Sequence, residues 1–268
     1  MKYKIIATDM DDTLLNSSHE ISEENIQSII EVQEKGVKFV LASGRPTFAM
    51  HSFANELDMK RLGGYILGYN GGEIIDVSTG DIIFEKALTR GDIEVIYNEA
   101  KNNELSFLTY SDDTIYGDEW NDYTTEEVTL TGMKWKEINS FDELPIEKSI
   151  KCMILGEPKK LTAVQKKLQE KYKQDYVINI SKPIFLEFTK KGINKGESLK
   201  RLCDMLGIST EEMICVGDSF NDMTMLEVAG LPVAVENARE EIKAISKFIT
   251  TSNDNHALKT LIFKYFRD

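Results

Sequence analysis

The chain has 268 residues, of which 41% are hydrophobic and 29% are charged, a composition typical of a folded soluble protein. That length is too great for one small hydrophobic core, so we expect one large domain or two unequal ones. The formal net charge is −13, from 32 basic and 45 acidic residues. Such a charge repels phosphate backbones and anionic lipids, which argues against a nucleic acid or a membrane as partner. A small phosphorylated substrate remains compatible, because a metal ion and a few cations can reverse the field locally.

The first part of the chain alternates predicted strands with predicted helices. The hydrophobic pattern predicts strands at residues 4–8, 37–42 and 65–68 and helices at 23–35 and 46–57. Ser22 is suited to cap the first helix, Gly36 to end it, and Pro46 to begin the second. Strands and helices that alternate over so few residues predict a parallel α/β sheet with right-handed crossovers.

The pattern changes in the middle of the chain, after a hairpin predicted at residues 73–76 and 81–85. Short strands at 105–110, 114–117, 150–155 and 176–180 then mix with helices at 90–102 and 158–173. We therefore expect an inserted α+β domain at residues 86–185 within an α/β core made of residues 1–85 and 186–268. The acidic run 118–127 predicts a solvated loop within the insert.

The three cysteines and the apolar runs indicate the cellular compartment of the protein. Cys152, Cys203 and Cys215 are too scattered for a disulfide framework or a zinc site, and each lies in an apolar run that predicts a buried thiol. No apolar stretch approaches the roughly 18 residues that predict a membrane span. Asp9 interrupts the N-terminal apolar run, which argues against a signal peptide. We expect a cytoplasmic protein.

The first strand ends in an unusual acidic sequence, Asp9-Met10-Asp11-Asp12-Thr13. Asp9 and Asp11 alternate at strand spacing, so their carboxylates leave the backbone in similar directions. Two carboxylates at such a short distance raise each other's pKa unless a cation offsets their charge. Their oxygen atoms are the type of ligand that suits Mg²⁺. An aspartate nucleophile beside a metal and a second acid is one interpretation. A simple turn is the other, because Asp and Thr are common turn residues.

The α/β pattern resumes late in the chain, with a helix at 195–206, strands at 213–217 and 231–235, and a C-terminal helix from about His256. Four polar clusters then lie at strand ends or helix starts: Asp9/Asp11/Thr13, Ser43-Gly44-Arg45, Lys195, and Asp218/Asn221/Asp222. Ligands of open α/β sheets bind outside the carboxyl ends of the strands, so we expect these clusters to meet in one crevice. Each cluster alone fits a plainer role, as a turn, a helix cap or a solvated lysine.

These clusters, in this order, resemble the four motifs of the haloacid dehalogenase superfamily of aspartate-nucleophile phosphatases. The gap between the second and third motifs, together with Tyr69-Asn70-Gly71-Gly72 and Val235-Glu236-Asn237-Ala238, resembles its Cof-type branch with a large α/β cap. The resemblance implies a Rossmann-like parallel-sheet core with an inserted cap domain. Two departures exist: Asp12 stands where that family commonly has Gly, and residues 253–257 lack a glycine that is often found there.

The resemblance assigns chemistry to the motif residues. Asp9 would attack phosphorus and form an aspartyl-phosphate, and Asp11 would act first as general acid and then as general base. Mg²⁺ would be held by the Asp9 carboxylate, the Asp11 carbonyl and Asp218, with Asp222 orienting the ligands.

The remaining site residues would bind phosphate or substrate. Ser43 and the Gly44 amide would hold phosphate oxygens, while Lys195 would neutralise charge on Asp9 and the phosphate. Asn221 would orient Lys195 or bind phosphate. Arg45 and Asn70 are expected to contact phosphate or substrate, with purely structural roles as the alternative.

The leading hypothesis is a Mg²⁺-dependent phosphatase for small phosphorylated metabolites such as a sugar phosphate, a nucleotide or a cofactor phosphate, acting as a monomer or small homo-oligomer. A phosphomutase of the same superfamily and a sensor that binds phosphometabolites without turnover are the alternatives. A receiver-type signalling module fits less well, because it needs neither an acid two residues after its nucleophile nor an inserted domain. The sequence identifies neither the substrate nor a role for Asp12.

Overall fold

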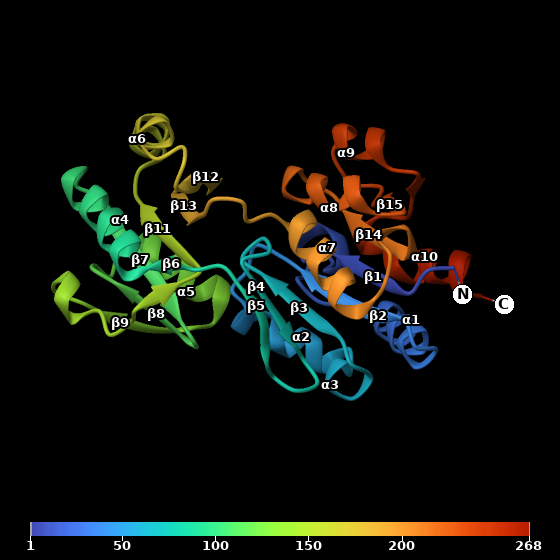
Figure 1. Ribbon diagram of the computed structural model, residues 1–268. Helices are drawn as coiled ribbons and strands as arrows, with labels where there is room; N and C mark the ends of the chain where they lie inside the picture. Colours follow the sequence, from blue (N-terminus) through green and yellow to red (C-terminus); the bar gives the residue numbers. More distant parts are fainter. Residues whose placement is uncertain (1, 268) are drawn as a thin grey trace. The chain divides into compact units, whose positions relative to one another are not determined.

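The computed structural model describes residues 2–267 and divides into two units (Figure 1). The core unit comprises Met1–Phe84 and Asn194–Asp268, and the inserted unit comprises Glu85–Ile193. The boundary predicted at residue 185 differs from the one in the structure. Strand β13 (Phe185–Lys190) pairs with two strands of the inserted unit, β11 (Lys151–Leu155) and β12 (Tyr176–Lys182), and so extends that unit.

The core unit is built on an eight-stranded sheet of order β16-β15-β14-β1-β2-β3-β4-β5. Its strands are β1 (Ile5–Thr8), β2 (Lys38–Ala42), β3 (Tyr65–Gly68), β4 (Glu73–Asp76), β5 (Ile82–Glu85), β14 (Met213–Gly217), β15 (Leu231–Ala234) and β16 (Phe248–Ile249). The six strands from β16 to β3 pair in parallel, and β4 runs antiparallel to β3. Every residue of β1 and β14 is buried, as expected for central strands of a parallel sheet that is covered on both faces. The predicted α/β class is confirmed.

The core helices follow the strands in chain order: α1 (Glu23–Glu34), α2 (His51–Glu56), α3 (Met59–Leu62), α7 (Lys195–Leu206), α8 (Met223–Val228), α9 (Glu240–Ile245) and α10 (Ala257–Phe266). The prediction of one continuous helix at residues 46–57 was wrong. Thr47–Met50 forms a 3₁₀ turn before α2, and Pro46 precedes that turn. Ser22 stands at the predicted N-cap of α1, but its hydroxyl lies 2.9 Å from His256 Nδ1 and makes no capping bond.

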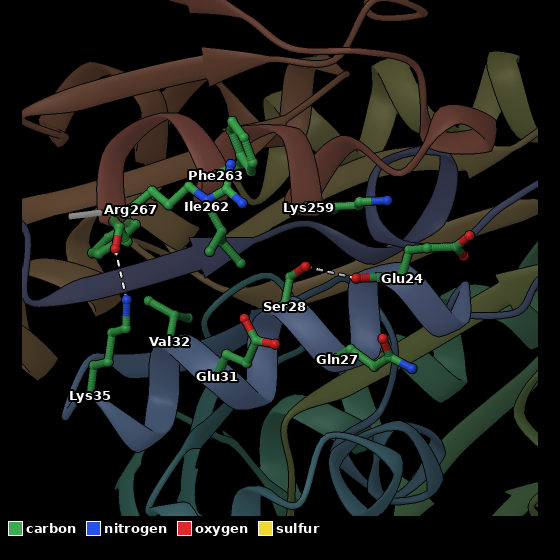
Figure 2. A pocket seen from close by; sticks show the side chains of 11 residues that line it. Glu24, Gln27, Ser28, Glu31, Val32, Lys35, Lys259, Ile262, Phe263 and Arg267 are labelled. Carbon is green, nitrogen blue, oxygen red and sulfur yellow. Dashed lines mark hydrogen bonds between the residues drawn. The ribbon is translucent and has the colours of Figure 1, made fainter.

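Helices α1 and α10 lie side by side and join an early segment of the chain to a late one (Figure 2). The backbone N–H of Lys259 donates to Asn25 Oδ1 at 3.0 Å, so α1 supplies a cap for the first turn of α10. At the other end of the pair, Lys35 Nζ donates to the Phe266 carbonyl at 2.9 Å. An open groove of about 310 Å³ runs between the two helices, and Phe263 is an exposed aromatic side chain on its border.

The inserted unit has its own six-stranded sheet, of order β12-β13-β11-β7-β8-β9. Its other elements are β7 (Ser106–Ser111), β8 (Thr114–Gly117), β9 (Lys134–Glu137), the short pair β6 (Leu88–Thr89) and β10 (Lys148–Ser149), α4 (Arg90–Asn102), α5 (Asp122–Thr131) and α6 (Pro158–Lys171). Helix α4 begins as predicted, because Thr89 accepts from the Asp92 N–H and Asp92 accepts in return from the Thr89 N–H. A separate apolar cluster fills this unit.

The solvated loop predicted at residues 118–127 was wrong. Residues 122–127 belong to α5, and the Glu127 carboxylate is buried, where it accepts a 2.6 Å hydrogen bond from the Tyr110 hydroxyl. Asp118 accepts from the Phe107 N–H and pairs with Lys101 at 2.6 Å. Cys152, Cys203 and Cys215 are free and buried, as predicted. No helix within residues 2–267 is long and apolar enough to cross a membrane.

Candidate active site

Three of the predicted motifs follow neighbouring strands in the middle of the core sheet. Asp9 follows β1, Ser43 follows β2 and Asp218 follows β14, and β1 pairs in parallel with both of the other strands. The carboxyl ends of parallel neighbours lie at one edge of the sheet, which is where ligands of open α/β sheets bind. Residues 209 positions apart in the sequence (218 minus 9) therefore come together.

A buried ion-pair triad forms the centre of the site. Lys195, the first residue of α7, is fully buried and donates to Asp9 Oδ1 at 2.5 Å and to Asp222 Oδ1 at 2.6 Å. The second oxygen of Asp9 accepts no hydrogen bond from any described residue. The third proton of the Lys195 ammonium likewise meets no acceptor within residues 2–267. Asp9 is thus held through one oxygen, while the other is available to react.

The loop after β14 anchors the acidic side of this triad. Asp222 Oδ2 accepts from the backbone N–H groups of Asp218 and Ser219, at 3.0 and 3.1 Å. Both carboxylate oxygens of Asp222 therefore have partners, and these fix the orientation of the carboxylate. Thr13 donates its hydroxyl proton to Asp218 Oδ1 at 3.0 Å and joins the first motif to the last.

The electrostatics of the site show excess negative charge. Burial raises the pKa of Asp9 well above its usual range, and Asp222 adds to this while Lys195 opposes it. Burial and Asp222 together raise the pKa of Asp218 to about 6. Burial alone would lower the pKa of Lys195, but the charges of Asp222 and Asp9 raise it overall. One ammonium therefore does not neutralise three carboxylates.

The same three carboxylates fit a divalent cation. Asp9, Asp218 and Asp222 each offer an oxygen atom, and these atoms lie within 4.8 Å of one another. An all-oxygen donor set of this charge suits a hard cation such as Mg²⁺, which would relieve the repulsion that raises these pKa values.

The turn after Asp9 gives a role to Asp12, for which the sequence predicts none. Asp12 adopts φ 58°, the left-handed conformation in which Gly is favoured and Asp is tolerated. Its carbonyl accepts a 2.7 Å bond from Asn237 Nδ2, whereas its side chain is exposed. Asp12 therefore serves through its backbone. The sequence marks the segment around Asn237 but predicts no contact for it.

The second motif forms a fixed loop beside this turn. The Arg45 N–H donates to Ser43 Oγ at 3.1 Å, and the Asn70 N–H donates to the Ser43 carbonyl at 2.9 Å. The Ser43 hydroxyl proton meets no acceptor among the described residues, so it is available to a bound anion. Gly44 lies against Asn70, whose Nδ2 is 3.1 Å from the position of a Cβ at Gly44. Asn221 Nδ2 lies 3.4 Å from Asn70 Oδ1.

Arg45 contacts another of the predicted site residues, Asp11. Its Nε and Nη2 atoms donate to Asp11 Oδ2 and Oδ1, at 2.9 and 2.5 Å. The structure therefore brings all ten of the predicted site residues into the core unit, but it pairs Arg45 with another of them.

Comparisons with known proteins identify the family of the chain. The family model for haloacid dehalogenase-like hydrolases matches residues 6–262. A putative phosphatase of Streptococcus pyogenes is 32% identical over 267 residues, 99% of this chain and 99% of that protein. A 5-amino-6-(5-phospho-D-ribitylamino)uracil phosphatase of Bacillus subtilis is 30% identical over 93% of this chain and 90% of its own. A solved haloacid dehalogenase-like hydrolase from Bacteroides thetaiotaomicron has a TM-score of 0.95 at 38% identity, covering 98% of this chain and 100% of that one. The chain belongs to the haloacid dehalogenase-like hydrolase family.

Proposed function

We propose that this hydrolase is a Mg²⁺-dependent phosphatase for small phosphorylated metabolites and that it works through an aspartyl-phosphate on Asp9. The observation that carries the proposal is the buried contact of Asp9 with Lys195, which holds one carboxylate oxygen and leaves the other unbonded. A carboxylate held in this way can act as a nucleophile towards phosphorus.

Two acids divide the chemistry between them. The free Asp9 oxygen bonds to phosphorus as the bond to the leaving oxygen breaks, and Asp11 gives that oxygen a proton. A water molecule then attacks phosphorus, Asp11 takes one of its protons, and the bond from phosphorus to Asp9 breaks. Asp11 is suited to this exchange because its side chain is 46% exposed, whereas that of Asp9 is 7% exposed.

The other site residues would hold charge in place. Ser43, the Gly44 amide and Asn221, with Asn70 beside them, would bind phosphate oxygens, and the third proton of Lys195 would point to the same anion. The carboxylates of Asp9 and Asp218 and the carbonyl of Asp11 would hold Mg²⁺, with Asp222 orienting them. The bound ion would stabilise the negative charge that develops during phosphoryl transfer.

The substrate class rests on the relatives and on the inserted unit. The Bacillus subtilis relative is described as acting on a phosphorylated ribityl compound, so a phosphate ester of a sugar alcohol is the first substrate class to test. We also propose that residues of the inserted unit, Glu85–Ile193, select among leaving groups.

Replacement of the nucleophile tests the proposal. Asp9→Asn should abolish hydrolysis of p-nitrophenyl phosphate in the presence of Mg²⁺, because an amide oxygen is a far weaker nucleophile than a carboxylate. Asp12→Asn is the matched control: it makes the same charge change three residues away, and Asn also tolerates the left-handed backbone. Circular dichroism would check that both variants fold. Activity of Asp9→Asn comparable to that of the control would refute the nucleophile assignment.

A further inference from the structure

The contact between Arg45 and Asp11 is more specific than an ordinary ion pair. Two guanidinium nitrogens bond two different carboxylate oxygens, at 2.9 and 2.5 Å. This paired geometry fixes the plane and direction of the carboxylate as well as its charge, which a lysine in the same place could not do. A carboxylate has about four lone-pair sites and the pair uses two, so each oxygen keeps a site for a transferred proton.

Arg45 is the fixed partner of this pair. Its N–H donates to Ser43 Oγ at 3.1 Å, and its carbonyl accepts from the Tyr69 N–H at 2.9 Å. Its guanidinium carbon also lies 5.7 Å from the centre of the Phe53 ring, within the range of a cation–π contact. The Arg45 side chain is 21% exposed and that of Asp11 is 46% exposed. The arginine is therefore held on several sides, while the aspartate projects from a short turn.

We propose that Arg45 is a positioning residue that acts on the reaction through Asp11. It holds the Asp11 carboxylate in the direction from which the proton reaches the leaving oxygen, and it does not serve mainly as a phosphate ligand. The inference rests on the proposed function, in which Asp11 is the acid and base. In the first step, Asp9 bonds to phosphorus while the bond from phosphorus to the leaving oxygen breaks. The Asp11 proton moves to that leaving oxygen at the same time. In the second step, the oxygen of a water molecule bonds to phosphorus, the bond from phosphorus to Asp9 breaks, and the water gives a proton to Asp11.

Leaving groups of different basicity separate the two roles of Arg45. A poor leaving group needs the proton from Asp11, whereas p-nitrophenolate departs almost without it. A phosphate ligand, by contrast, contributes equally whatever the leaving group. The quantity to compare is kcat/KM, because it reports the steps up to departure of the leaving group and excludes hydrolysis of the aspartyl-phosphate.

The experiment measures kcat/KM with p-nitrophenyl phosphate and with an alkyl phosphate for the wild type, Arg45→Met, Asp11→Asn and the double variant. We expect Arg45→Met to lose less than about 5-fold on p-nitrophenyl phosphate and on the order of 100-fold on the alkyl phosphate, within the range that proton transfer contributes. In the Asp11→Asn background, the same arginine replacement should cost almost nothing further, since the residue it positions no longer carries the proton. Arg45→Lys should resemble Arg45→Met, because it keeps the charge and loses the paired geometry.

Arg61→Met is the matched control. Arg61 also binds a carboxylate through its Nε, that of Asp58 at 2.5 Å, but both side chains are exposed and neither belongs to the site. The Arg61→Met replacement should leave kcat/KM unchanged for both substrates, and thermal melting would confirm that each variant is folded. If Arg45→Met lowered kcat/KM equally for both substrates, and did so also in the Asp11→Asn background, the inference would be overturned in favour of phosphate binding. Absence of hydrolysis by the wild type would overturn the proposed function and the inference with it.

Discussion

At the scale of single residues, Lys195 is the charge on which the site depends. It is fully buried between Asp9 and Asp222, at 2.5 and 2.6 Å. Lys195→Met would leave two carboxylates buried without their cation, and the loss of one member of a buried ion pair costs about 3–5 kcal/mol of unfolding free energy. Urea denaturation in metal-free buffer would measure this change, and hydrolysis should be lost together with it.

Lys200→Met provides the comparison within the same helix. Lys200 pairs with Glu197 at 2.8 Å, but the two side chains are 46% and 61% exposed. Such a surface pair contributes little, so the unfolding free energy should change by less than about 1 kcal/mol. Equal stability of the two variants would contradict the assignment of Lys195 as a buried counter-ion.

The raised pKa of Asp218 predicts a dependence of stability on pH. Its pKa is about 6 in the folded protein against an ordinary value of 3.8, so between these values the folded state binds more protons than the unfolded one. The stability that this group contributes is full below pH 3.8 and is lost as the pH rises through about 6. Mg²⁺ binds the ionised carboxylates, so its stabilising effect should grow over the same range.

Thermal melts in EDTA and in Mg²⁺ over a series of pH values would measure both effects. Asp218→Asn removes the titrating group, so the difference in Tm between the wild type and this variant isolates its contribution from that of other carboxylates. In EDTA the wild type should lose Tm relative to the variant from pH 4 to pH 7, and Mg²⁺ should reverse this only in the wild type. Parallel curves in both buffers would rule out the metal site.

The sequence predicted which polar residues come together in the core unit, but not all of their partners. Asp9, Lys195 and Asp222 could be grouped because their motifs follow parallel strands or begin a helix. The pairing of Arg45 with Asp11 depends on the local turn at Asp12 and on the loop held by Tyr69. Backbone conformations of this kind leave no periodic signal, so an arginine that positions an acid could not be distinguished from one that binds phosphate.

At the scale of elements, the close packing of α7 on α8 places Lys195. A Cβ on Gly196 would lie 2.2 Å from the Thr224 carbonyl oxygen, so the two helices meet where only glycine fits. Gly196→Ala should displace the start of α7, with a loss of about 1–3 kcal/mol and a fall in kcat as Lys195 moves away from Asp9. Urea denaturation and steady-state kinetics would measure the two effects.

Gly91→Ala is the matched control for this replacement. Gly91 also lies in the first turn of a helix, α4, but the nearest atom to its added Cβ is 3.9 Å away. Alanine there should be neutral or should stabilise the protein by up to about 1 kcal/mol. A stable and fully active Gly196→Ala variant would show that α7 can shift without moving its lysine.

Elements were predictable where local signals agreed with the tertiary structure. Helix α7 spans the predicted residues 195–206, and α4 spans the predicted residues 90–102. The predicted helix at 46–57 is α-helical only from His51 to Glu56. The turn before it is 3₁₀, and there the Thr47 hydroxyl donates to the Glu73 carboxylate at 2.6 Å. Helix α5 was missed because its acidic sequence suggests solvent, whereas Tyr110 provides a buried partner for Glu127.

At the scale of the whole molecule, the core is discontinuous in sequence. The inserted unit separates its two parts, and the pattern of the sequence revealed this because parallel α/β order stops and then resumes. The exact junction depended on pairing across the insert's sheet, where β13 joins β11 and β12. Pairing between distant strands is not encoded locally, so the boundary could be predicted only approximately.

The pairing of β1 with β14 has a consequence for synthesis of the chain. Ile5 lies opposite Met213, so one side of the central strand has no partner until about two hundred later residues have been made. At a translation rate of about 5–20 residues per second, that wait is roughly 10–40 s. During this time an apolar strand with an unpaired edge is prone to join other chains. The inserted unit therefore emerges complete before the two parts of the core can close.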